Sequence, residues 1–167
     1  MPFHFDDLDV VSEVSGLSSA LIVPCYMCPA VTVAIREKKP FMQFFRLAPF
    51  GAYIKKMRSA LKEKGIRTKV FKSFLYHQWF MCIWTGRRRK KLQDAVKGYE
   101  AVIVLGCESA AATVRECIQS TDCKVVEGMK TVGITNAQPR LGLPCHVYFE
   151  DCKTVPLPQH NTPGFPR

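Results

Sequence analysis

Residues 99–117 read Tyr-Glu-Ala-Val-Ile-Val-Leu-Gly-Cys-Glu-Ser-Ala-Ala-Ala-Thr-Val-Arg-Glu-Cys, an apolar run that passes directly into a helical pattern. A continuous apolar run of this length is typical of a strand that is buried on both faces. After Cys107, the apolar residues Ala110, Val114 and Ile118 recur at helical spacing. A strand that leads into a helix is the building unit of α/β proteins.

A second strand-to-helix unit lies nearer the N-terminus. Residues 19–24 form an apolar run that leads into Cys25-Tyr-Met-Cys28, and Pro29 suits the first turn of a helix. Further helices are predicted over 52–64 and 87–96, and further strands over 66–74, 124–127, 132–134 and 146–149. Because strands alternate with helices, we predict an α/β fold: an open three-layer sheet with a parallel portion, flavodoxin-like or Rossmann-like.

The 167 residues suit one domain with a core of ordinary size. We predict a single α/β domain over 19–155, a mobile acidic N-terminal arm over 1–18 and a Pro-rich tail over 156–167. No apolar run approaches the roughly 18 residues of a membrane-spanning helix. The acidic N-terminus also lacks the basic start of a secretory signal. We therefore expect a cytoplasmic protein that does not contact a membrane.

Cysteines are the residues that best indicate function, and the chain has eight. In a reducing compartment, clustered cysteines are metal ligands or redox groups rather than disulfides. Cys25 and Cys28 have the spacing of a metal-ligand pair, and the helix start beside them is expected to lower their pKa. Cys107 also follows a buried strand, and Cys82 completes a set of four. We predict that Cys25, Cys28, Cys82 and Cys107 bind zinc or an iron-sulfur cluster.

The other four cysteines give weaker signals. Cys117 lies on the apolar face of its helix, so we interpret it as a core residue. Cys123, Cys145 and Cys152 lie in or near predicted loops, and no spacing assigns them to a site.

A run of basic residues opens the helix over 87–96, in a chain whose net charge is +10. Positive charge at a helix start opposes the helix dipole, so we interpret the run as a surface for an acidic protein partner. Nearby aromatic residues leave nucleic acid as a second, less favoured partner. The partner-binding residues predicted in this way are Arg87, Arg88, Arg89, Lys90 and Lys91.

The stretch over 99–117, followed by Lys124-Val-Val-Glu-Gly-Met-Lys-Thr-Val-Gly-Ile, resembles the cysteine-rich C-terminal domain family associated with methylenetetrahydrofolate reductases. In that family an apolar strand ends in Gly-Cys, as Gly106 and Cys107 do here, and a cysteine cluster precedes the domain. The resemblance implies an accessory protein of one-carbon metabolism. Such a protein would bind zinc or iron-sulfur and work beside a folate- or corrinoid-dependent methyl-transfer enzyme.

Three functions follow from these patterns. The first is a cysteine-liganded metal protein that acts as an accessory or electron-transfer protein. The second is a thioredoxin-like dithiol oxidoreductase, in which Cys25 attacks and Cys28 resolves. The third is a basic nucleic-acid-binding module. Phosphate-binding glycine loops, dinucleotide fingerprints and serine-hydrolase elbows are missing from the sequence, which leaves nucleotide-driven and serine-hydrolase chemistry without support.

Overall fold

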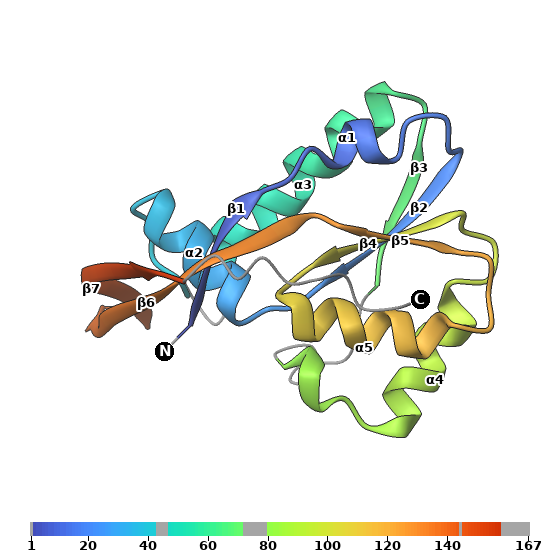
Figure 1. Cartoon of the computed structure of the whole chain (residues 1–167). Coiled ribbons are helices and arrows are strands. Elements are labelled where there is room, and N and C mark those ends of the chain that lie inside the picture. The colour runs from blue at the N-terminus through green and yellow to red at the C-terminus, as the bar shows by residue number, and fades with distance from the viewer. Residues whose placement is uncertain (1, 43–46, 72–79, 144, 158–167) are drawn as a thin grey trace.

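The structure is a computed structural model, and it describes residues 2–42, 47–71, 80–143 and 145–157 (Figure 1). The elements in chain order are β1 (Phe3–Asp7), α1 (Val10–Glu13), β2 (Ser19–Pro24), α2 (Cys28–Arg36), α3 (Ala48–Glu63), β3 (Arg67–Val70), the 3-10 helix η1 (Met81–Ile83), α4 (Gly86–Ala95), β4 (Ala101–Leu105), α5 (Glu108–Ile118), β5 (Lys124–Glu127), β6 (Met129–Gly142) and β7 (His146–Pro156). Among the helices of the described part, none combines the length and apolar character that a bilayer crossing requires.

Four parallel strands form the central sheet, in the order β3-β2-β4-β5. Helices α1, α2 and α3 pack on one face of this sheet, and η1, α4 and α5 pack on the other (Figure 1). Numbered among themselves, the parallel strands run 2-1-3-4, which matches the beginning of the flavodoxin-like order. The predicted three-layer α/β fold is confirmed.

The two central strands, β2 and β4, are buried along their whole length. Alternate residues serve opposite faces: Ile22 and Ile103 pack toward α2 and α3, whereas Leu21 and Val102 pack toward α4 and α5. A strand without a wet face has no reason to carry polar residues, so its sequence is a continuous apolar run. This burial explains why both strands could be located from the sequence alone.

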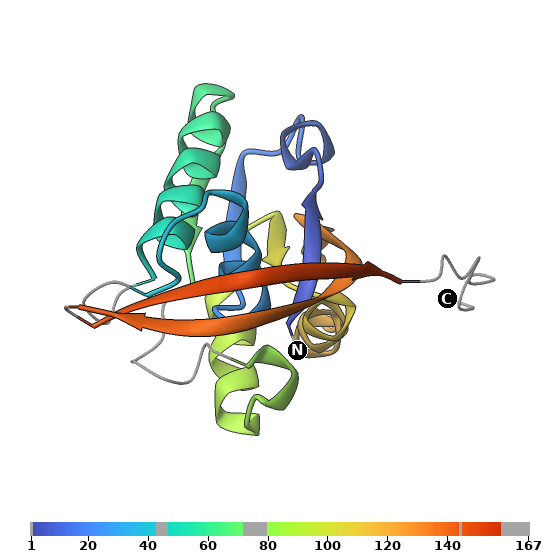
Figure 2. The same cartoon turned by 90° about the vertical axis from the view of Figure 1, so that its left-hand side faces the viewer.

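A second, antiparallel sheet has the order β1-β6-β7. Its strands β6 and β7 form a long hairpin that reaches beyond the helices (Figure 2). The strands predicted over 132–134 and 146–149 are only small parts of these two strands. Most residues of the hairpin are exposed or only partly buried. Its sequence therefore lacks the alternation of polar and apolar residues that marks a strand with one buried face.

The first residues belong to the folded domain rather than to an arm outside it. Strand β1 pairs with β6, and Phe5 and Val14 are buried in the core. The acidic Asp7 forms an ion pair with Arg36 of α2 at 2.9 Å and accepts a hydrogen bond from the Tyr53 hydroxyl at 3.0 Å. The acidic residues of this segment suggested a solvated arm, but Asp7 instead joins β1 to α2 and α3. The predicted tail lies outside the described residues from 158 onward.

Candidate thiol site

The carboxyl edge of the parallel sheet carries two of the predicted ligands. Cys25 directly follows β2, and Cys107 follows β4 after the single residue Gly106. The backbone N–H of Cys25 donates to the carbonyl of Leu105 at 2.8 Å, which ties the two strand ends together. The chain leaves β2 toward α2 on one face and leaves β4 toward α5 on the other. In open α/β sheets, ligands bind at such a switch point.

Gly106 makes the close approach of these strand ends possible. A Cβ atom at position 106 would lie 2.6 Å from Cβ of Ala110 and 3.4 Å from Cβ of Cys25. The first distance is shorter than any normal carbon contact, so a side chain here would push α5 away from the Cys25 loop. Glycine thus keeps the helix that begins after Cys107 packed against Cys25.

Cys28 and Cys82 reach the same edge from other elements. Cys28 is the first residue of α2, and its sulfur receives a backbone hydrogen bond from Phe3 of β1. Cys82 is the middle residue of η1 and is exposed. The neighbouring residue Met81 gives a backbone hydrogen bond to the sulfur of Cys25. The η1 turn therefore lies directly beside the Cys25 thiol.

Electrostatic interactions connect the four thiols. Charges on Cys28 and Cys107 raise the pKa of Cys25, and charges on Cys107 and Cys82 raise the pKa of Cys28, in both cases after the larger effect of burial. Such effects require charges that lie near one another. Cys25, Cys28 and Cys107 therefore lie within electrostatic range of one another, and Cys82 lies within range of Cys28. In the described part of the chain, no three His, Cys, Asp or Glu side chains are arranged to hold a metal ion as they stand.

Burial dominates the acid-base chemistry of the pair. Cys25 is only 7% exposed, and burial raises its pKa to about 11, although backbone N–H groups of Met81 and Met27 oppose the shift. Burial also raises the pKa of Cys28. The helix-start argument predicted lowered pKa values, and that prediction is wrong because loss of solvation outweighs the helix end. Both thiols are therefore neutral at pH 7 in the metal-free protein.

The remaining cysteines lie elsewhere. Cys117 is buried on the inner face of α5, as predicted, and Cys123 is half-buried before β5. Cys145 and Cys152 are exposed on the β6–β7 hairpin, Cys145 with a positive φ of 58° in its turn. None of these four thiols is among the charges that raise the pKa of Cys25 or Cys28.

The basic run at the start of α4 does not form one exposed surface. Arg87, Lys90 and Lys91 are exposed, whereas Arg88 is only 8% exposed and Arg89 forms an ion pair with Glu116. The Arg88 guanidinium lies over the rings of Phe71 and Trp84, 4.8 and 5.1 Å from their centres. The sequence signal for this burial was helical spacing, because Arg88 lies four residues before the buried Leu92.

No protein-family model matches this sequence, and no curated protein matches it either. Function is therefore inferred from the thiol site and its surroundings.

Proposed function

We propose that this protein holds a metal centre, an iron-sulfur cluster or zinc, through Cys25, Cys28, Cys82 and Cys107. The observation that supports the proposal is that Cys25 and Cys107 follow neighbouring strands at the switch point of the sheet, where both interact electrostatically with Cys28, and Cys28 also with Cys82. Four cysteine thiolates are a ligand set that structural zinc and iron-sulfur clusters share. When bound, the centre would supply either a fixed Lewis acid or a one-electron carrier.

The pKa of Cys25 favours metal binding over dithiol exchange. An attacking thiol reacts as its thiolate, and a pKa of about 11 leaves about one molecule in ten thousand ionised at pH 7. A metal replaces the proton and stabilises the thiolate, so a buried cysteine remains a good ligand. Backbone N–H groups from Met81 and Met27 already face the Cys25 sulfur and would support its negative charge.

The surroundings of Cys82 support a role that involves a partner protein. Cys82 is exposed, and the apolar side chain of Ile83 beside it is 73% exposed. The exposed cations Arg87, Lys90 and Lys91 follow within nine residues. An apolar contact next to a thiolate ligand, with positive charge nearby, suits transient docking of an acidic protein. We infer an accessory or electron-transfer protein of the cytoplasm.

The family resemblance extends this proposal to one-carbon metabolism. The partner would then be a folate- or corrinoid-dependent methyl-transfer enzyme. This assignment rests on the resemblance over 99–117 and 124–134, which includes Gly106 and Cys107, and on the cysteine pair ahead of it.

The test is metal and acid-labile sulfide analysis of protein purified without oxygen, together with its visible spectrum. Wild type, Cys25→Ser and the matched control Cys152→Ser, a change on the distant hairpin, are compared. We expect metal in wild type and control and its loss in Cys25→Ser. Iron with sulfide favours electron transfer, and stoichiometric zinc favours a structural or methyl-transfer site. The same metal content in all three proteins, or none after reconstitution with iron and sulfide or with zinc, contradicts the proposal.

A further inference from the structure

The turn that carries Cys82 is weakly held by its own backbone. Helix η1 has only three residues, and short 3-10 turns have poor hydrogen-bond geometry. The N–H of Trp84 reaches the carbonyl of Met81 at 3.2 Å, and the N–H of Ile83 reaches that of Phe80 at 3.4 Å. A ligand on such a turn keeps its position only if other elements hold the turn.

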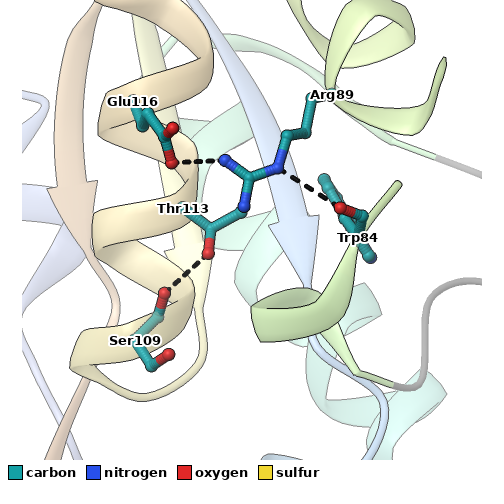
Figure 3. Close-up of polar contacts among 5 residues, drawn as sticks. All are labelled: Trp84, Arg89, Ser109, Thr113 and Glu116. Carbon is teal, nitrogen blue, oxygen red and sulfur yellow. Dashed lines mark hydrogen bonds and ion pairs between the residues drawn. The ribbon is translucent and has the colours of Figure 1, made fainter. Parts of the chain in front are cut away.

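Arg89 of α4 provides such a contact, as Figure 3 shows. Its Nε donates to the backbone carbonyl of Trp84 at 3.3 Å, at the end of the η1 turn. Through Nη1, the same guanidinium forms an ion pair with Glu116 of α5. A single planar side chain therefore joins the Cys82 turn to the helix that begins after Cys107.

The ring of Trp84 is held as well. It is buried, lies 5.8 Å from the ring of Phe71 and contacts the Arg88 guanidinium. Arg89 thus fixes the backbone of Trp84, while Arg88 and Phe71 fix its side chain. These contacts also account for arginines at a helix start, where the dipole disfavours them.

We propose that Arg89, acting through Glu116, is a positioning residue of the thiol site, which keeps Cys82 in register with Cys107. The inference rests on the proposed function, because it takes Cys82 as a ligand. Helix α5 connects the two positions, since Cys107 is its N-cap residue and Glu116 lies in its last turn. Without the contact, the Cys82 turn would open more often, while the other three thiols stayed in place.

The test compares Arg89→Met and Glu116→Gln with wild type. Asp94→Asn is the control, because it removes another exposed ion pair of α4, Lys97 with Asp94 at 3.0 Å. Amide exchange of residues 83 and 84 is followed in the metal-free protein, and Co²⁺ binding is followed by its sulfur-to-metal absorption. We expect exchange and Co²⁺ release to quicken up to about fivefold in both variants, the factor that an exposed ion pair contributes. Arg89→Lys should restore part of the effect.

The two readouts separate the possible failures. If wild type binds neither Co²⁺ nor any other metal, the proposed function fails, and the exchange rates still test the contact. If wild type binds Co²⁺ but Arg89→Met behaves like Asp94→Asn in exchange or in release, the positioning role is overturned. Because Glu116 is exposed, Glu116→Gln keeps the test valid if Arg89→Met fails to fold.

Discussion

The parallel sheet and the β6–β7 hairpin show how position in the fold changes the chemistry of one residue type. Strands β2 and β4 are buried throughout, and a cysteine at their carboxyl edge, Cys25, has its pKa raised to about 11. Strand β7 has no buried residue, and its Cys152 is exposed. A cysteine is thus a protected candidate ligand at the edge of the parallel sheet and an accessible surface group on the hairpin.

The largest expected difference concerns packing. Replacing the fully buried Ile103 of β4 by Ala should cost about 2–5 kcal/mol of unfolding free energy, because it leaves a cavity in the sheet's core. Replacing Val155 of β7, which is 60% exposed, by Ala should change it by less than about 0.5 kcal/mol. Urea unfolding measures both. Equal losses would mean that the hairpin is as tightly packed as the central sheet.

A pH series sharpens the comparison of the two cysteines. The folded pKa of Cys25 is raised above its ordinary value of 9.0, so the native state holds this proton more strongly than the unfolded state does. The resulting stability is fully present below about pH 9 and is lost between about pH 9 and 11, by roughly 2–3 kcal/mol. Urea unfolding of metal-free protein at pH 7 and 10.5 should show most of this loss, about 2 kcal/mol, in wild type and in Cys152→Ala. A loss of the same size in Cys25→Ala would assign it to other groups.

Gly106 offers a smaller test of the sheet edge. Gly106→Ala places a Cβ 2.6 Å from Ala110 and should destabilise the protein by about 1–3 kcal/mol and weaken metal retention. Gly51 of α3 is the matched control, because no atom lies within 4 Å of a Cβ there. Gly51→Ala should stabilise the protein by about 0.5–1 kcal/mol, as expected for a helix interior. Thermal unfolding distinguishes the two signs, and a neutral Gly106→Ala would contradict the tight approach at Cys25.

The smallest expected effects come from exposed ion pairs. Asp7→Asn removes the pairing with Arg36 and weakens the bond from Tyr53, which together join β1 to α2 and α3. We expect a loss of up to about 1 kcal/mol. Arg140→Gln, which removes the pair with Glu150 on the hairpin, should change stability less. A larger loss for Arg140→Gln in urea unfolding would reverse the proposed ranking of the two regions.

The sequence predicts those parts of the fold whose environment is uniform. Strands β2 and β4 are continuous apolar runs because both of their faces are dry, and the helices that follow them keep a clear apolar face. The extent of β6 and β7 was not predictable from periodicity, because most of the hairpin contacts solvent on both sides. Strand β1 was missed because it is short and mostly polar, and only Phe5 among its residues is buried.

The candidate site was predictable in part for the same reasons. Cys25, Cys28 and Cys107 follow recognisable strands, and the strand-end rule places them at one edge. Nothing local in the sequence shows that η1 lies beside Cys25, since this is seen only in a contact between distant segments, the backbone hydrogen bond from Met81 to the Cys25 sulfur. The raised pKa of Cys25 was also out of reach, because it depends on three-dimensional burial rather than on the neighbouring helix start.

The most direct test of the thiol site is alkylation of each cysteine, followed by mass spectrometry, in protein isolated without oxygen. We expect Cys25, Cys28, Cys82 and Cys107 all to be protected while the metal is bound. When a chelator removes the metal, the exposed Cys82 should become reactive, whereas Cys25 should stay slow because burial keeps its thiol neutral. The exposed Cys145 and Cys152 should react at once in both states. Cys82 is decisive, because it is exposed in the fold and only a bound metal would shield it. If Cys82 reacts as fast as Cys152 before metal removal, the four-thiolate site is contradicted.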